Sequence, residues 1–92
     1  MFENKNILVT GGAGFIGSHL CDEILKHDAG NVIVLDNLSL GNIDNLKDAS
    51  QDQRLQIIVG DACDYAIVKD IILTHEIDIV FNLAVIPLPA SL

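Results

Sequence analysis

The stretch that decides the fold reads Thr10-Gly11-Gly12-Ala13-Gly14-Phe15-Ile16-Gly17. Its glycines fit two overlapping registers, Gly11/Gly14/Gly17 and Gly12/Gly14/Gly17. Glycines at this spacing let the chain turn sharply from a strand into a helix, leave the helix N-terminus bare, and allow a diphosphate to approach the backbone closely. The unpaired N–H groups and the positive end of the helix dipole then bind phosphate without lysine. No Gly-Lys-Ser/Thr follows the turn, which excludes a P-loop.

The residues on either side of this turn have the periodicity of a strand and a helix. The apolar run Ile7-Leu8-Val9 precedes it and predicts a buried strand. After it, Ile16, Leu20 and Ile24 recur every four residues, with Leu25 beside them. This spacing predicts one apolar helical face, so we expect Ile16 to lie in the core. The run Asp28-Ala29-Gly30-Asn31 is expected to end the helix.

Three further apolar runs, rich in branched side chains, follow at intervals long enough for helices. They are Val32–Leu35, Leu55–Val59 and Ile77–Phe81. Between the last two, a helical repeat of apolar residues predicts a second helix, which Asp64 is placed to cap and which ends near His75. The stretch from Ser39 to Asp52 carries a weaker signal, and only Ile43 and Leu46 suggest a short helix there.

Strands that alternate with helices predict βαβ units and a parallel sheet. We therefore expect an α/β fold: a Rossmann-type, doubly wound parallel sheet that is incomplete, with four strands in the order 3-2-1-4 and flanking helices. Right-handed crossovers place the first two connections on one face of this sheet. The reversal of strand order at the fourth strand sends the third connection to the other face.

Asp36 is the second feature that bears on function. It stands at the end of the second predicted strand, 19 residues beyond Gly17. A carboxylate at this place accepts hydrogen bonds from the adenosine ribose hydroxyls and repels a 2′-phosphate. No Arg or Lys occurs from Asn31 to Asn45 to attract such a phosphate. The pattern favours NAD over NADP; the alternative is that Asp36 is only a turn residue at a strand end.

The composition excludes several other classes of partner. Half of the residues are hydrophobic, as expected for strands buried on both faces, and the net charge is −8 with only five basic residues. Nucleic acids and anionic membranes are therefore not expected partners. Cys21 and Cys63 have no metal-ligand spacing, and the longest apolar run, Ile79 to Ala90, is too short to span a bilayer. These features favour a soluble, cytoplasmic protein with two buried, reduced thiols; a disulfide between them is the alternative.

These motifs resemble the start of an extended short-chain dehydrogenase/reductase, and more narrowly the NAD-dependent epimerase/dehydratase family that acts on nucleotide sugars. Residues 10–20 match the opening motif of that family. Asp36-Asn37-Leu38-Ser39 with Gly41-Asn42 is similar to the ribose-binding strand end of its 4-epimerases. Gly60-Asp61-Ala62-Cys63-Asp64 resembles the turn whose first aspartate binds the adenine amino group. Asn82-Leu83-Ala84-Val85 resembles the motif after the fourth strand, although Asn82 and Val85 stand where His and Ala or Gly are commoner.

The turn and the resemblance together imply a set of cofactor contacts along the chain. The expected NAD-binding residues are Gly11, Gly14, Phe15, Ile16, Gly17, Asp36, Asn37, Leu38, Ser39, Gly41, Asp61, Ala62, Leu83, Ala84 and Val85. Some of these have a simpler alternative. Asp61 fits an ordinary turn, and residues 83–85 fit core packing at a strand end.

No catalytic residue and no metal ligand is assigned within this chain. The resemblance implies a Tyr and a Lys, four residues apart on a later helix, that transfer the proton. Tyr65 and Lys69 have that spacing, but they begin the helix after the third strand, beside the turn that the adenine would contact, so we reject the pair. The three histidines lie on or at the ends of the predicted helices, and we assign them no metal and no catalytic role.

Taken together, residues 1–92 are expected to form the NAD-binding half of a nucleotide-sugar epimerase, dehydratase or decarboxylase, with catalysis and the sugar pocket on sequence outside them. The resemblance implies a nucleotide-sugar substrate and a homodimer for the whole protein. The alternatives are a non-catalytic, NAD-sensing module of the same fold and, more distantly, an S-adenosylmethionine-binding domain. A Tyr-x-x-x-Lys pattern beyond Leu92, after a fifth strand, would favour the enzyme.

Overall fold

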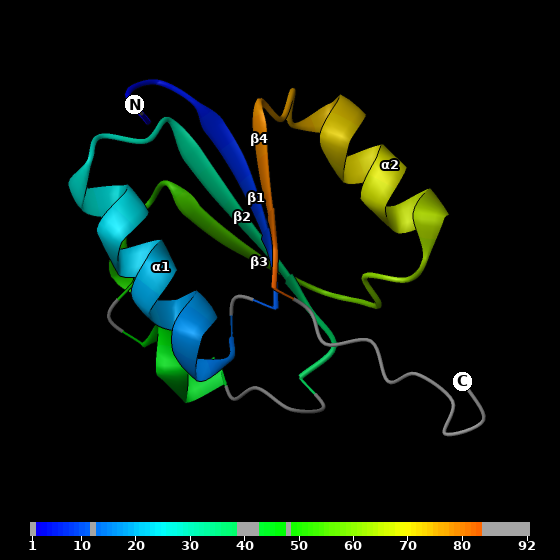
Figure 1. Cartoon of the computed structure of the whole chain (residues 1–92), viewed down its shortest axis with the longest axis horizontal. Helices are drawn as coiled ribbons and strands as arrows, with labels where there is room; N and C mark the ends of the chain where they lie inside the picture. The colour runs from blue at the N-terminus through cyan, green and yellow to red at the C-terminus, as the bar shows by residue number, and fades with distance from the viewer. Residues whose placement is uncertain (1, 12, 39–42, 48, 84–92) are drawn as a thin grey trace.

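The structure is a computed structural model, and it describes residues 2–11, 13–38, 43–47 and 49–83. The described elements follow the alternation predicted from the sequence. In chain order they are β1 (Asn6–Thr10), α1 (Phe15–Lys26), β2 (Asn31–Asp36), the short 3₁₀ helices η1 (Ile43–Leu46) and η2 (Ala49–Gln51), β3 (Leu55–Val59), α2 (Tyr65–Thr74) and β4 (Ile79–Asn82) (Figure 1).

The four strands are parallel and stand in the order β3-β2-β1-β4, which confirms the predicted topology. Thr10 at the end of β1 is in register with Leu35 of β2 on one side and with Asn82 of β4 on the other. The reversal of strand order therefore lies between β1 and β4. In sheets of this kind ligands bind beyond the carboxyl ends of the strands at this reversal.

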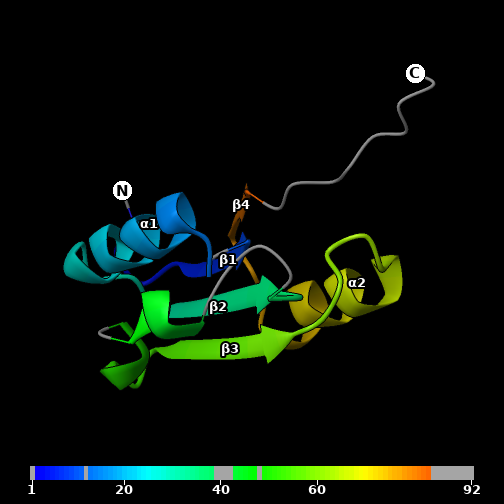
Figure 2. The same cartoon turned by 90° about the horizontal axis from the view of Figure 1, so that it is seen from below.

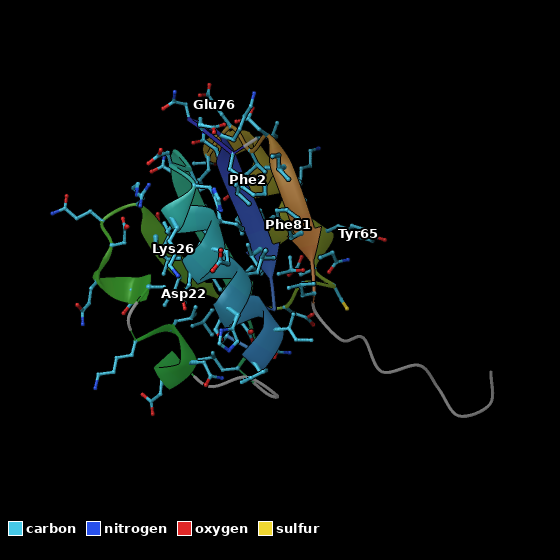
Figure 3. All side chains as sticks on the ribbon, turned by 60° about the vertical axis from the view of Figure 1, so that its left-hand side comes forward. Phe2, Asp22, Lys26, Tyr65, Glu76 and Phe81 are labelled. Carbon is cyan, nitrogen blue, oxygen red and sulfur yellow. The ribbon has the colours of Figure 1, made fainter. Side chains whose placement is uncertain are left out.

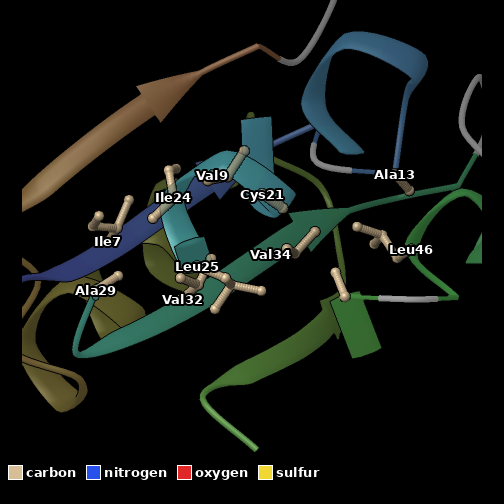
Figure 4. Packing of buried hydrophobic residues seen from close by; sticks show 11 residues of the cluster. Ile7, Val9, Ala13, Cys21, Ile24, Leu25, Ala29, Val32, Val34 and Leu46 are labelled. Atoms are coloured by element: carbon tan, nitrogen blue, oxygen red, sulfur yellow. The ribbon is translucent and has the colours of Figure 1, made fainter. Parts of the chain in front are cut away.

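The two faces of the sheet are covered by different connections, as predicted, and Figure 2 shows α1 and α2 on opposite sides. One face packs against α1, η1 and η2, and the other packs against α2. Because alternate residues of a strand point to opposite faces, β1 sends Ile7 and Val9 toward α1 and Leu8 toward α2. Figure 4 shows the first of these clusters between α1 and the sheet.

The prediction that Ile16 belongs to the core is wrong, because 72% of this residue is exposed. The buried face of α1 instead carries Gly17, Cys21 and Ile24. A row of residues spaced by four drifts by about 40° per step on a helix with 3.6 residues per turn. Ile16 therefore lies about 80° around the axis from Ile24, whereas Gly17, seven residues before Ile24, lies within about 20° of it.

The second helix begins and ends where the sequence predicted. Asp64 caps α2, since its Oδ1 accepts hydrogen bonds from the backbone N–H of Ala66 at 3.0 Å and of Ile67 at 3.4 Å. His75 is the residue at the C-terminal cap. The short helix suggested between residues 39 and 52 is two 3₁₀ turns, η1 and η2, which bury Leu46 and Ala49 against the α1 side of the sheet.

The side chains of Arg54 and Phe2 connect segments that lie far apart in the sequence. Arg54 donates hydrogen bonds to the carbonyl oxygens of Leu25, at 2.9 Å, and Ala29, at 3.1 Å, and it forms an ion pair with Asp52 at 2.7 Å. These bonds attach the segment before β3 to the C-terminal end of α1. Phe2 packs edge-on against Phe81 of β4, with 6.0 Å between the ring centroids (Figure 3).

No helix in the described part of the chain is long and apolar enough to cross a membrane.

Candidate dinucleotide-binding site

The described part of the glycine turn leaves the N-terminus of α1 bare. Gly11 has a φ of 76°, in the left-handed region that favours glycine, and its N–H donates to the carbonyl of Leu35 at 2.9 Å. The N–H of Gly14 donates back to the carbonyl of Gly11 at 3.1 Å, which closes the turn. Gly14 is the N-cap of α1, and no side chain among the described residues caps it. Gly12 lies outside the described residues.

The first turn of α1 offers backbone donors to a ligand. The first N–H groups of any α-helix have no partner within the helix. In this fully described helix the first turn holds no acidic side chain, and Phe15 and Ile16 are 75% and 72% exposed. The bare amides and the helix dipole together make this end of α1 suited to an anion.

Asp36 lies beside the turn and joins it to the end of β2. Its Oδ2 accepts a hydrogen bond from the backbone N–H of Ala13 at 3.0 Å, and its Oδ1 accepts one from Leu38 at 2.7 Å. The residue is only 8% exposed. An ionised carboxylate has about four acceptor positions. These two bonds leave acceptor positions on Asp36 to which hydroxyl groups of a ligand can donate.

The residues directly after Asp36 have an unusual backbone. Leu38 has a φ of 63°, a conformation that costs about 1–3 kcal/mol for a residue with a β-carbon. The bond from its N–H to Asp36 and the packing of its side chain against the α1-side cluster stabilise this conformation. Asn37 is exposed beside it. Ser39 and Gly41, also expected at the site, lie outside the described residues, as does Asn42.

The end of β4 is joined to β1 by a pair of polar side chains. The hydroxyl of Thr10 donates to Oδ1 of Asn82 at 2.6 Å, and the N–H of Leu83 donates to the carbonyl of Thr10 at 2.9 Å. Sequence reasoning missed this pair, although both residues stand at strand ends within the quoted motifs. Leu83 is 36% exposed at the same edge of the sheet. Ala84 and Val85 lie outside the described residues.

The turn after β3 stands at the far side of the same edge. The N–H of Gly60 donates to the carbonyl of Asp36 at 3.0 Å, so the turn is attached to β2. Oδ1 of Asp61 accepts from the N–H of Cys63 at 2.8 Å, as in an ordinary Asx turn, and Asp61 is exposed. Ala62 packs partly buried against the α2-side cluster. The structure therefore shows for Asp61 the turn role that was the simpler alternative.

Sequence reasoning also missed Asn45. Its Nδ2 donates to the carbonyl oxygen of Ala13 at 2.8 Å, across 32 positions of the chain. The only sequence signal was that Asn45 lies in a polar connection after Asp36, which does not distinguish it from its neighbours. Ala13 itself is fully buried, with no exposed area.

The rejected pair Tyr65 and Lys69 lies on α2, on the sheet face opposite α1 (Figures 2 and 3). Tyr65 is 88% exposed. Both residues line a shallow hollow of about 310 Å³, whose other walls are Val68, Ile72 and Leu73. Within the described ranges, no group of three or more His, Cys, Asp or Glu is arranged to hold a metal ion.

The two cysteines differ in environment. Cys21 lies on the buried face of α1, and this burial raises the pKa of its thiol to about 12. The expectation of two buried thiols is wrong for Cys63, which is exposed because it lies in the turn after β3 and not on a face that packs against the sheet. Desolvation and then the neighbouring Asp61 carboxylate raise the pKa of the Cys63 thiol. Neither thiol has the lowered pKa of a reactive cysteine.

The similar proteins found by comparison are named as decarboxylases, dehydratases and epimerases of nucleotide sugars. UDP-glucuronic acid decarboxylase 6 of Arabidopsis thaliana is 42% identical over 81 residues, which cover 88% of this chain and 22% of that protein. dTDP-glucose 4,6-dehydratase of an Actinoplanes species is 40% identical over 77 residues, covering 76% of this chain and 24% of that protein. This chain therefore spans about a quarter of the length of the curated relatives that it matches.

Solved structures of similar fold include complexes with NAD. dTDP-glucose 4,6-dehydratase from Bacillus anthracis, in complex with NAD, superposes with a TM-score of 0.83 at 29% identity and covers 89% of this chain and 27% of that one. UDP-glucose 4-epimerase from Brucella ovis, also with NAD, gives a TM-score of 0.76 at 28% identity over 91% of this chain and 24% of that one. These similarities confirm the Rossmann-type fold.

A family model described as GDP-mannose 4,6 dehydratase matches residues 8–87, which include the glycine turn, Asp36 and the ends of all four strands. The resemblance to nucleotide-sugar epimerases and dehydratases of the short-chain dehydrogenase/reductase type is thereby confirmed. The chain belongs to the GDP-mannose 4,6 dehydratase family.

Proposed function

We propose that residues 1–92 form the NAD-binding half-domain of an enzyme that acts on a nucleotide sugar. The observation that carries this proposal is the position of Asp36 against Ala13, beside the bare N-terminus of α1. An acceptor for ribose hydroxyls and a set of donors for a diphosphate stand next to each other in the arrangement that an adenine dinucleotide requires.

The diphosphate would bind at the glycine turn and the first turn of α1, through the backbone of Gly11, Gly14, Phe15, Ile16 and Gly17. Gly14 supports this assignment in a particular way. Its φ of −73° suits any residue. Among the described residues, the nearest atom to a β-carbon at this position would be the carbonyl oxygen of Gly11, at 3.4 Å, which is an ordinary van der Waals distance. Since the fold does not require glycine at this position, close approach of a ligand is a sufficient reason for it.

The ribose would bind to Asp36, with Asn37, Leu38, Ser39 and Gly41 around it, and this acid favours NAD over NADP. The adenine would lie against Asp61 and Ala62, and the nicotinamide side against Leu83, Ala84 and Val85. Support for this order comes from the sheet: β3, β2, β1 and β4 present the described members of these groups along one edge.

The substrate in this proposal is a nucleotide sugar, since the relatives are named for UDP- and dTDP-linked sugars. When bound, NAD supplies the hydride acceptor and donor at a sugar carbon. The residues of this chain bind and orient it. We place the proton-transferring groups and most of the sugar pocket outside residues 1–92, and Tyr65 and Lys69 take no part. For the whole protein the resemblance leads us to propose a cytoplasmic homodimer, with which the free thiols of Cys21 and Cys63 agree.

The test is a calorimetric titration of NAD, and separately of NADP, into the protein that carries this chain. We expect NAD to bind at least about tenfold more tightly, which corresponds to about 1.4 kcal/mol. Equal affinities would overturn the role of Asp36, and no binding of either dinucleotide would overturn the proposed function. NAD binding without hydride transfer to or from any nucleotide sugar would favour the sensing module.

A further inference from the structure

The peptide groups on both sides of Ala13 are held by two side chains, one from the end of β2 and one from the connection that follows it. The Ala13 N–H donates to Oδ2 of Asp36 at 3.0 Å, and the Ala13 carbonyl accepts from Nδ2 of Asn45 at 2.8 Å. The methyl group of Ala13 is fully buried in the α1-side cluster. The middle of the glycine turn is therefore attached to the rest of the fold at three points.

The bond to Asn45 also determines the orientation of the next amide. The peptide group is planar, so the carbonyl of Ala13 and the N–H of Gly14 point in opposite directions within one rigid unit. The N–H end of this unit is bonded to the carbonyl of Gly11 at 3.1 Å, and its oxygen end is bonded to Asn45. A rotated unit would lose both bonds and would turn its carbonyl oxygen toward the carbonyl of Gly11, so the turn at the bare N-terminus of α1 would have to change its shape.

Asn45 itself is held in place by its neighbour in η1. Leu46 is fully buried against the α1 side of the sheet, whereas Asn45 is exposed. A neutral hydrogen bond that is partly open to water contributes only about 0.5–1.5 kcal/mol to stability. Removing the Asn45 side chain should therefore leave the fold intact while it frees the Ala13–Gly14 unit to rotate.

We propose that Asn45 is a positioning residue for the dinucleotide site: its amide holds the carbonyl of Ala13 and thereby orients the turn that receives the diphosphate. This inference rests on the proposed function. Asn45 acts through the Ala13–Gly14 peptide, without contact to the nucleotide, and it links the connection after β2 to the glycine turn. Loss of the Asn45 amide should therefore weaken the binding of ligands that carry phosphate and leave the binding of other ligands almost unchanged.

The binding test compares two ligands in the protein that carries this chain. Asn45→Leu keeps the size of the side chain and removes the donor, and Asn45→Ala removes the side chain. The control Ser50→Ala removes a different hydrogen bond from the same connection, that of its hydroxyl to the Lys47 carbonyl at 3.0 Å. We expect both Asn45 variants to raise the Kd of ADP about tenfold and that of adenosine less than about twofold, with no change for the control. An unchanged Kd of ADP, or equal losses for both ligands, would overturn the proposal.

A spectroscopic test reports on the turn without any ligand. Alanine labelled with ¹³C at its carbonyl and glycine labelled with ¹⁵N select Ala-Gly peptides, of which these 92 residues contain two, Ala13–Gly14 and Ala29–Gly30. We expect Asn45→Leu to shift the first resonance and to leave the second in place. An unmoved first resonance would contradict the role of Asn45. If the unsubstituted protein binds neither ADP nor NAD, the proposed function fails, while this shift still decides whether Asn45 holds the turn.

Discussion

Asp36 accepts a hydrogen bond from the backbone N–H of Ala13 at 3.0 Å, across 23 positions of the chain. The bond joins the end of β2 to the glycine turn after β1, and Asp36 is 8% exposed where it does so. The acid that would bind the ribose and the turn that would bind the diphosphate are therefore held together by the fold itself. A dinucleotide would meet a site that needs little rearrangement, which lowers the entropic cost of binding.

The first prediction concerns the charge of Asp36. Asp36→Asn should weaken NAD binding by about tenfold or more, because one charged acceptor of ribose hydroxyls is lost, a loss of about 1.4 kcal/mol. NADP should lose less, because repulsion of its 2′-phosphate also disappears, so the preference for NAD should shrink. Calorimetric titration of both dinucleotides checks this. Asp70→Asn, on the exposed surface of α2, is the matched control, and an unchanged NAD-to-NADP ratio in Asp36→Asn would contradict the assignment.

Two glycines of the turn should respond differently to alanine. Gly11→Ala should destabilise the fold by about 1–2 kcal/mol, because its φ of 76° is costly for a residue with a β-carbon. Gly14→Ala should cost less than about 1 kcal/mol, since its φ is −73°, yet it should weaken NAD binding because a methyl group obstructs the approach of the diphosphate. Urea unfolding and NAD titration of each variant separate the effects. A Gly14→Ala protein with unchanged NAD affinity would refute this explanation.

A third prediction concerns acid stability. The side-chain hydrogen bond from Arg54 lowers the pKa of Asp52 to about 2, below its ordinary value of 3.8. A lowered pKa in the folded state means that Asp52 stabilises the fold above about pH 4, and that this contribution is lost as the pH falls toward 2. Since both side chains are about one third exposed, the contribution should be about 1 kcal/mol or less.

The comparison that checks it is the free energy of unfolding of the unsubstituted protein and of Asp52→Asn between pH 7 and pH 2. The two should differ most at neutral pH and converge between about pH 4 and pH 2. A difference that stays constant over this range would show that the Asp52–Arg54 pair does not titrate as described.

The fourth prediction uses the exposed thiol. Cys63 should react with a thiol reagent in the folded protein, slowly because its pKa is raised, whereas the buried Cys21 should react only after unfolding. Bound NAD should slow the reaction of Cys63, because this residue donates its backbone N–H to Asp61 in the turn assigned to the adenine. The modification rate with and without NAD, in a Cys21→Ser background, measures this. If the modification rate of Cys63 is the same without NAD and with saturating NAD, the adenine does not bind at this turn.

The fifth prediction is that residues 1–92 on their own self-associate or are unstable. Among the described strands, β4 pairs with β1 alone, and Val80 is 48% exposed along it. On α2, Leu73 is 67% exposed. Exposed apolar edges of this kind favour pairing between chains. Sedimentation at increasing concentration should show association, and Val80→Lys with Leu73→Lys should reduce it while Gln53→Lys should not. A sharply melting monomer would contradict this prediction.

Local sequence patterns were sufficient for the order of the elements and for the turn from β1 into α1. The four apolar runs predicted the strands, and the position of Asp64 predicted the start of α2, because strand and helix periodicity and capping depend on near neighbours in the chain. The pattern was misleading at Ile16. Spacing by four residues identifies a row of side chains, but the tertiary contacts decide where along that row the covered surface ends.

The sequence by itself determined the alternation of strands and helices, the glycine turn, and the acid at the end of the second strand. Only the tertiary structure decided that Asp36 and Asn45 meet Ala13 and that Thr10 bonds to Asn82. The physical reason is the range of the interactions. Periodicity and turn chemistry act within a few residues, whereas these bonds join atoms 23 to 72 positions apart that only the register of the folded sheet brings together.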